Sequence, residues 1–249
     1  MQGSSLAPDL IRKMDTDGSA NPFAENGQLI KQDLSYQDLG NIDFDGMDAK
    51  HAYLKTKAVI LEQLEMNNKI ISYGGDHSVS FPVIEMYAQK YQNLNVLHFD
   101  AHADIYENFQ DNPYSHASPF ARLMETKLIH KLTQVGIRTL DTHQRQQIKK
   151  FNVEVIEMKD FNFDFINHLK GPLYISIDLD GLDPAYAPGV SHHEPGGLST
   201  REVIKCIQDI KVPIVGADIV EYNPKRDINN MTAMVAYKLF KELAAKIIE

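Results

Sequence analysis

The chain has 249 residues, 43% of them hydrophobic and 24% charged, and its formal net charge at pH 7 is −9. This composition is typical of a globular protein, and the acidic balance disfavours nucleic acid and anionic membranes as partners. The single cysteine, Cys206, excludes an intrachain disulfide, and no apolar run approaches the ~20 residues that cross a bilayer. We therefore expect a cytoplasmic protein with no nucleic-acid or membrane partner.

Segments with helical periodicity alternate with short apolar runs from residue 48 onward. Apolar stripes and capping residues predict helices over residues 48–67, 80–91, 116–126, 141–151, 165–169, 199–210 and 231–248. The β-rich runs predict strands over residues 69–73, 94–99, 132–137, 153–158, 173–177 and 212–220. Residues 15–46 are polar and contain several glycines, and we expect a surface loop there with one short strand, Gln28–Lys31.

This alternation predicts an α/β fold. Strands that are almost entirely apolar and separated by helices indicate parallel βαβ units, with both faces of the sheet covered. Right-handed crossovers then place the carboxyl ends of all strands at one edge of the sheet, where open α/β sheets bind their ligands. Because the sequence contains no linker, repeat or low-complexity tract, residues 1–249 are predicted to form a single domain.

Acidic and imidazole side chains follow four of the predicted strands directly. They lie in the segments GGDHS (74–78), DAHAD (100–104) and DLD (178–180), and at Glu221. Residues two and four apart in an extended segment point to the same side, so Asp100, His102 and Asp104 should converge, as should Asp178 and Asp180. Carboxylates buried together raise one another's pKa unless a cation holds them.

Two divalent cations would balance these four carboxylates, and His77 and His102 add neutral nitrogen ligands. Oxygen and imidazole ligands without a thiolate suit Mn²⁺, with Zn²⁺, Co²⁺ or Fe²⁺ as alternatives. Two ions about 3.5–4 Å apart can share a water molecule and acidify it at neutral pH. The pattern therefore predicts a metal centre that activates water.

Three blocks, GGDHS (74–78), DAHAD (100–104) and SIDLDGLDPAYAPGV (176–190), resemble the signatures of the ureohydrolase family, the arginase and agmatinase group. The resemblance covers almost the whole chain from Gln2 onward. The segments YSHASPFARLME (114–125), GVSHHEPGG (189–197) and GADIVEYNPKRD (216–227) are most similar to plant-type arginases and related bacterial proteins. The resemblance implies an arginase-like, three-layer α/β/α sandwich with a mainly parallel sheet, assembled as trimers or hexamers.

The resemblance also implies roles for individual residues. Six residues match the ligands of two Mn²⁺ ions per chain: His77, Asp100, His102, Asp104, Asp178 and Asp180. His77 would serve one ion and His102 the other, and Asp104 and Asp178 would bridge them. Of the remaining site residues, His116 matches a proton shuttle, and Glu221 matches the carboxylate that binds the guanidinium of the substrate. Hydroxide would attack the guanidinium carbon, Asp104 would relay the proton, and urea and an amine would leave.

Two features depart from the family pattern. The family has a strand before the segment that matches Gln2–Arg12, and we expect the sheet here to lack it. The Thr-Pro pair that many members carry after the third block is replaced by His192 and His193. A second-layer or rim position is expected for these histidines, with metal ligation as the alternative. His98 is expected to be a core histidine whose ring is satisfied by the backbone, and Cys206 a core residue.

The resemblance implies a small guanidino compound as the substrate, and the sequence does not determine the rest of that molecule, its tail. The loop from Tyr106 to Ala121 contains no lysine or arginine but two acidic residues, Glu107 and Asp111, which favours the amine of agmatine. The alternative is arginine, whose α-carboxylate would need neutral donors such as Asn108 or Ser115. We therefore expect an agmatinase that releases putrescine, with an arginase as the alternative and another guanidino or formimino hydrolase as a third.

Two rival classes differ in their metal requirement. A deacetylase of similar fold would hold a single zinc ion, whereas six ligands favour a dinuclear site. A non-enzymatic metal-buffering or regulatory subunit would fit a chain that had lost ligands, and every ligand position here is filled.

Overall fold

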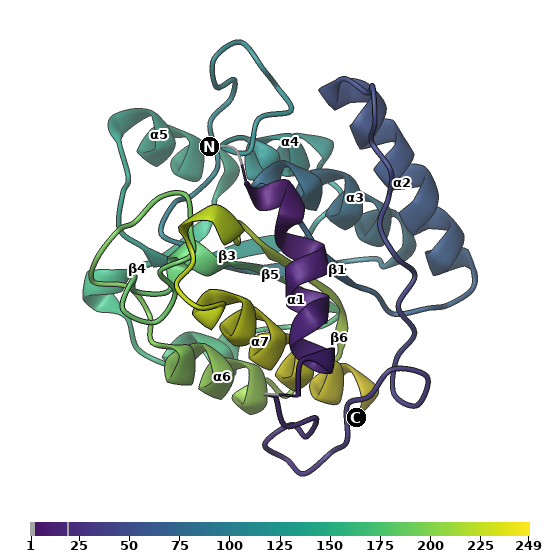
Figure 1. The fold of residues 1–249 in the computed structure, drawn as a ribbon. Helices are drawn as coiled ribbons and strands as arrows, with labels where there is room; N and C mark the ends of the chain where they lie inside the picture. Colours follow the sequence, from purple (N-terminus) through teal and green to yellow (C-terminus); the bar gives the residue numbers. More distant parts are fainter. Residues whose placement is uncertain (1–2, 19) are drawn as a thin grey trace.

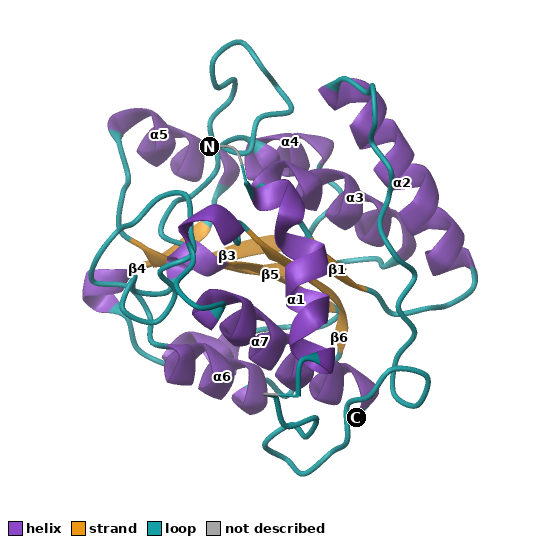
Figure 2. Ribbon diagram, in the orientation of Figure 1, coloured by secondary structure: helices purple, strands orange, loops and turns teal. Residues whose placement is uncertain are grey.

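Six strands form one parallel sheet in the computed structural model, which describes residues 3–18 and 20–249. The strands are β1 (Ile71–Tyr73), β2 (Asn95–Phe99), β3 (Lys131–Ile137), β4 (Glu154–Glu157), β5 (Leu173–Asp178) and β6 (Ile214–Val220). Their order across the sheet is β1-β6-β5-β2-β3-β4, and each neighbouring pair is parallel. The predicted α/β fold with a parallel sheet is confirmed (Figure 2).

Helices cover both faces of the sheet and complete three layers (Figure 1). One face carries α1 (Ala7–Thr16), α6 (Thr200–Asp209) and α7 (Met231–Ile248). The other face carries α2 (Ala49–Glu65), α3 (Ser80–Lys90), α4 (Pro119–Thr126) and α5 (Thr142–Phe151). No helix in the described part of the chain combines the length and the apolar content that a bilayer crossing needs.

Strand β5 shows how the sequence divides the interior into two cores. Leu173, Ile175 and Ile177 point into the core beneath α1, α6 and α7. Tyr174, between them, packs into the core beneath α2, α3 and α4. Because alternate side chains of a strand face opposite sides, one apolar strand contributes to both cores, which explains its nearly continuous apolar sequence.

The four strands that precede the acidic and histidine motifs lie next to one another in the sheet. Strand β1 precedes GGDHS (74–78), β6 precedes Glu221, β5 ends in Asp178, and β2 precedes DAHAD (100–104). These strands occupy consecutive positions in the order β1-β6-β5-β2. The predicted gathering of their carboxyl ends at one edge is therefore confirmed.

Helix α1 was not anticipated, although its pattern is present in the sequence. Ala7, Ile11 and Met14 recur at helical spacing and are buried against α7. Polar contacts reinforce this packing, since the hydroxyl of Tyr237 donates to Asp15. The sequence predicted a loop over residues 15–46 and no element before them, and it therefore missed a helix whose partner lies more than 200 residues away in the sequence.

Two further boundaries differ from those expected. Helix α4 begins at Pro119 rather than at His116, because a proline lacks an amide hydrogen and fits best in the first turn. The prediction of a strand over Gln28–Lys31 is wrong. Phe23 and Leu29 form an isolated antiparallel bridge around a turn at Gly27, whose φ is 85°. Most of the other elements lie close to their predicted ranges.

Candidate metal centre

His77 enters the centre from a tight turn that follows β1. Asp76 caps the short helix His77–Val79 by accepting from the amide of Ser78 at 3.1 Å. At Gly74, a Cβ atom would lie 2.6 Å from a Val79 methyl and 2.7 Å from a Val220 methyl, so only glycine fits between them. The turn thereby brings the fully buried imidazole of His77 over the ends of β5 and β2.

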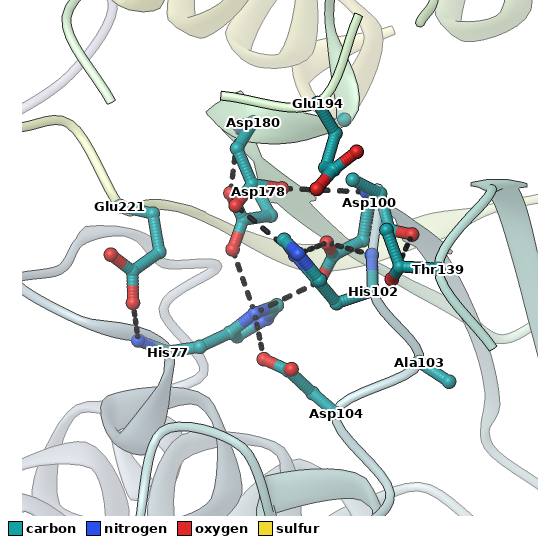
Figure 3. Close-up of polar contacts among 12 residues, drawn as sticks. His77, Asp100, His102, Ala103, Asp104, Thr139, Asp178, Asp180, Glu194 and Glu221 are labelled. Atoms are coloured by element: carbon teal, nitrogen blue, oxygen red, sulfur yellow. Dashed lines mark hydrogen bonds and ion pairs between the residues drawn. The ribbon is translucent and has the colours of Figure 1, made fainter. Parts of the chain in front are cut away.

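The first group of donor atoms surrounds Nδ1 of His77 (Figure 3). This nitrogen lies 3.0 Å from Oδ2 of Asp178, 3.1 Å from Oδ2 of Asp104 and 3.3 Å from Oδ2 of Asp100. The three carboxylates come from the ends of β5 and β2 and are all buried. One cation could therefore be bound by one imidazole and three carboxylates.

The second group lies on the other side of Asp100. Nδ1 of His102 is 3.2 Å from Oδ2 of Asp180 and 3.4 Å from Oδ1 of Asp100. The Asp180 amide donates to Asp178 at 2.8 Å, so these two carboxylates are held in different directions. The six residues named from the sequence thus form two adjacent groups.

The shared carboxylate is Asp100, which differs from the expected arrangement. Asp100 belongs to both groups, whereas Asp104 and Asp178 belong only to the first. The expectation treated residues 100–104 as extended, but β2 ends at Phe99 and Asp104 adopts a left-handed backbone with φ 44°. Asp104 belongs to the group around His77 and not to the group around His102, so the geometry favours Asp100 over Asp104 as the carboxylate that the two groups share.

The crowding of like charges shows in the pKa values. Burial raises the pKa of Asp178 well above its usual range, and Asp180 and Asp100 raise it further. Burial, together with Asp100, raises the pKa of Asp180 to about 7. The opposite holds for His102, where Asp100 and Asp180 outweigh burial and raise the imidazole pKa to about 12. The two groups therefore concentrate negative charge that a bound cation would offset.

The donor set fits divalent cations. Nδ1 of His77 and Oδ2 of Asp100 are buried, and no hydrogen-bond geometry satisfies either atom. Buried polar atoms without partners are costly, and here they face other donor atoms at 3.0–3.3 Å. Carboxylate and imidazole ligands with no thiolate suit Mn²⁺ and similar ions. A bound divalent cation would therefore satisfy these buried donor atoms better than their contacts with one another do.

A chain of hydrogen bonds behind His77 holds its ring. Nε2 of His77 lies 3.1 Å from the Ser176 hydroxyl, which donates to Oδ1 of Asp218 at 2.6 Å. The hydroxyl of Tyr174 donates to the other oxygen of Asp218 at 2.9 Å. Such contacts orient a ligating imidazole. Sequence reasoning missed this layer, although Ser176 and Asp218 lie within the quoted motifs.

Arg138 holds two loops of the site together. Its guanidinium donates over 2.6–3.3 Å to the main-chain carbonyls of Gly136, Asp180, Gly181, Leu182 and Glu194. The carbonyls of residues 180–182 belong to the loop of Asp180, and that of Glu194 belongs to the loop of His192. Sequence reasoning also missed this arginine, which directly follows β3 and carries no acidic neighbour in sequence.

His98 was interpreted wrongly. Its ring contacts side chains rather than the backbone: Nδ1 lies 3.0 Å from Nε2 of Gln134, and Nε2 lies 2.8 Å from Oδ2 of Asp100. With His77 and Asp100 it forms a third group of converging donor atoms. Its position two residues before Asp100 on β2 was the available signal, since alternate residues face the same side of a strand.

Glu221 lies beside the first group in a left-handed backbone conformation with φ 63°. Its amide donates to Gly75 at 2.9 Å, and one carboxylate oxygen accepts from the amide of His77 at 2.9 Å. Burial and the charge of Asp76 raise the pKa of Glu221 to about 8. The strained backbone therefore places a buried carboxyl at the edge of the candidate metal centre.

Histidines form the rim above the second group. The ring of His192 stacks on that of His116 with centroids 6.2 Å apart and meets His102 edge-on at 5.8 Å. His193 instead contacts the Pro188 carbonyl at 2.8 Å and the Arg226 guanidinium at 3.1 Å. The structure thus places His192 and His116 together over the site, and His193 in the supporting loop.

The two candidate tail-binding residues lie on the same loop but differ in burial. Asn108 is exposed, whereas Ser115 is buried and accepts from the Ala117 amide at 3.3 Å. Tyr106 fastens the loop to α5 by donating to Asp141 at 2.6 Å. The loop between Asp104 and His116 is therefore anchored at Tyr106, while Asn108 faces solvent.

The fold and the donor groups define an α/β protein with a carboxylate–imidazole metal centre at the carboxyl edge of a parallel sheet. A model of the Arginase family matches residues 1–245, and the chain belongs to this family. This match confirms the resemblance to the ureohydrolases. It also confirms that the chain is an enzyme of the arginase and agmatinase group.

Individual relatives include both arginases and agmatinases. Arginase 1, mitochondrial, of Arabidopsis thaliana is 43% identical over 262 residues, covering 99% of this chain and 77% of the relative. An agmatinase of Bacillus subtilis (strain 168) is 29% identical, covering 97% of this chain and 84% of the relative. The structure of an arginase from Medicago truncatula has a TM-score of 0.94 and 40% identity, covering 99% of this chain and 82% of that one.

Proposed function

We propose that this protein is an arginase that hydrolyses the guanidino group of arginine to urea and ornithine. The observation that carries the hydrolytic part is the pair of donor groups that share Asp100. The choice of arginine is supported by 43% identity to a plant arginase against 29% to a bacterial agmatinase. This ranking favours arginine, which the sequence offered as the alternative substrate. Agmatine was the substrate expected first.

The entrance loop also gives less support to agmatine than its sequence did. Nζ of Lys150, on α5, lies 3.5 Å from the carboxylate of Glu107. The cation that the loop sequence lacks is therefore supplied by a neighbouring helix. Because the pair is exposed, its attraction is modest, but it offsets the negative charge that favoured a cationic tail. A tail that carries both an ammonium and a carboxylate suits this balanced entrance.

The two donor groups would hold the cations, which we propose to be two Mn²⁺ per chain. His77, Asp104 and Asp178 would complete one site with Asp100, and His102 and Asp180 the other. Bound there, the ions would lower the pKa of a shared water so that it can attack at neutral pH. Asp104 faces the first site only and would accept the proton from that water.

Glu221 would bind and orient the guanidinium. One of its oxygens already accepts from the His77 amide at 2.9 Å, which leaves the other oxygen to accept from a substrate N–H. A planar cation with paired donors suits a carboxylate in this role. The arriving positive charge would also keep the buried carboxyl ionised.

His116 would carry a proton between solvent and the leaving amine. It lies at the rim with its ring stacked on His192, between the buried centre and the entrance loop. An imidazole can both donate and accept a hydrogen bond, as a proton carrier must. After water attacks the guanidinium carbon, the bond to the leaving nitrogen breaks as that nitrogen gains a proton, and urea and ornithine separate.

Urea release from arginine and from agmatine, measured side by side on the Mn²⁺-loaded protein, tests the proposal. We expect arginine to be hydrolysed with the higher kcat/KM. A preference for agmatine would overturn the substrate assignment and leave the ureohydrolase reaction standing. The variant Asp100→Asn is the control for contaminating activity, because it removes the carboxylate common to both groups.

A further inference from the structure

Among the described residues, a buried histidine beside the metal centre has no role in the reaction proposed above. His98 lies on β2 directly opposite Gln134 on β3, and neither side chain is exposed to solvent. The imidazole is enclosed by the rings of Phe120, at a centroid distance of 4.1 Å, and His77, at 4.9 Å. Its orientation is therefore fixed, and its two nitrogen atoms meet different partners.

The amide of Gln134 determines which nitrogen of His98 carries the proton. Nε2 of Gln134 lies 2.6 Å from the carbonyl oxygen of Ala103 and 3.0 Å from Nδ1 of His98. A main-chain carbonyl only accepts hydrogen bonds, so the atom facing it must be the amide nitrogen rather than the amide oxygen. The second hydrogen of that nitrogen then points to His98.

Because Nδ1 of His98 accepts from Gln134, the ring holds its single proton on Nε2. This nitrogen lies 2.8 Å from Oδ2 of Asp100, the carboxylate shared by both donor groups. The angle falls short of hydrogen-bond geometry, yet both buried atoms have no other hydrogen-bond partner. The second oxygen of Asp100 accepts from the His102 amide at 2.6 Å. The two oxygens of Asp100 are thus approached from two fixed directions.

We propose that His98 is a positioning residue for the metal centre, held by Gln134 in the Nε2–H form so that it donates to Asp100 and fixes the orientation of the bridging carboxylate. The inference rests on the proposed metal centre. His77, His98 and Asp100 could also be interpreted as a metal site in which His98 is itself a ligand. The proposal excludes this interpretation, because a protonated Nε2 has no lone pair for a metal. A donor behind a metal-ligating carboxylate contributes about 10–100-fold in metal affinity or activity.

The protonation state can be read directly, without substrate or turnover. Histidine side chains of the full-length, metal-free protein are labelled with ¹⁵N, and the His98 signals are assigned as those lost in His98→Gln. We expect the long-range ¹H–¹⁵N pattern of the Nε2–H tautomer. The Nδ1–H tautomer, or a doubly protonated ring, would overturn the proposal. So would loss of the Nε2 proton on addition of Zn²⁺, a diamagnetic probe, because His98 would then be a ligand.

Mn²⁺ titration of chelator-treated protein tests the consequence for the centre. We expect His98→Phe, which keeps a ring but removes the donor, to weaken Mn²⁺ binding about 10–100-fold. His98→Gln should recover part of this loss because its amide can donate. Cys206→Ala, a change in the buried face of α6, is the control for destabilisation alone and should leave Mn²⁺ affinity unchanged. Equal affinity in His98→Phe and the unmodified protein would contradict the proposal.

The variant Gln134→Glu tests the same proposal while His98 itself is left unchanged. A carboxylate at this position would accept a proton from Nδ1 and reverse the tautomer, so that a lone pair faces Asp100. We expect the NMR pattern to change to Nδ1–H and Mn²⁺ binding to weaken tenfold or more. An unchanged tautomer with unchanged affinity would contradict the inference. None of these measurements uses a guanidino compound. A result that contradicts the role of His98 can therefore be told apart from a result that contradicts the arginase assignment.

Discussion

The buried metal centre and the exposed entrance differ in how their side chains are held. Each carboxylate of the centre is buried at the end of a strand, and Asp100 and Asp178 also accept backbone amides. At the entrance, the pair of Glu107 and Lys150 spans 3.5 Å between side chains that are 59% and 50% exposed. The sheet therefore fixes the groups that we propose to activate water, whereas the groups that we propose to meet the substrate tail depend on weak surface contacts. On this proposal, we expect the fold to set the chemistry and the loops to set the substrate preference.

The sharpest way to test this difference is to remove one carboxylate from the centre. Because Asp100 belongs to both groups, Asp100→Asn should lose both metal ions and reduce kcat by several orders of magnitude. Asp104→Asn should retain the ion held by His102 and Asp180, and lose only the other. Metal analysis beside urea release separates the two variants. Equal metal content in the two variants would contradict the assignment of Asp100, and not Asp104, as the shared carboxylate.

A second prediction concerns Arg138, which joins the loop of Asp180 to the loop of His192. Arg138→Lys keeps the charge but cannot reach the carbonyls of both the Asp180 loop and Glu194. We expect a loss of about 2–3 kcal/mol in the free energy of unfolding, since hydrogen bonds to charged groups contribute about 1.5–3 kcal/mol each. Urea denaturation monitored by circular dichroism measures this. We also expect a higher KM for arginine, because the loop of His192 would no longer be fixed.

The entrance should respond far less to substitution. Lys150→Gln removes the cation beside Glu107 and should shift the ratio of kcat/KM values for arginine and agmatine about twofold toward agmatine, as befits an exposed ion pair. Lys149→Gln, on the neighbouring exposed position of α5, is the matched control and should leave the ratio unchanged. A tenfold or larger shift would mean that the tail is recognised here more strongly than the exposure of the pair implies.

The smallest effect is expected at a surface contact far from both regions. Arg201 and Gln208 lower the pKa of Glu25 from 4.5 to about 2. A carboxyl with a lower pKa in the folded state stabilises the protein above its unfolded pKa and loses that contribution as the pH falls. Because the Glu25 side chain is 34% exposed, we expect Glu25→Gln to cost only about 0.5 kcal/mol at pH 7. The difference from the unmodified protein should narrow between pH 4.5 and 2 in denaturation curves.

The fold and the gathering of the six donor residues at one edge of the sheet could be predicted because both depend on local pattern. Apolar runs marked the strands, and residues directly after a strand must lie at its carboxyl end. The sharing of Asp100 could not be predicted this way, because it depends on how the side chains of His77, His102 and Asp180 are placed around it. His98 was misread because its partner, Gln134, is identified only by the pairing of β2 with β3. Contacts between distant segments thus limited what the sequence alone could reveal.

The pairing of α1 with α7 has a consequence for the order of synthesis. Helix α1 leaves the ribosome before α7 (Met231–Ile248), and more than 200 residues separate the two helices. Ile11 and Met14 are buried against the core that α7 completes, so their apolar face has no native cover while those residues are made. That face is therefore open to chaperones and proteases until α7 has been synthesised.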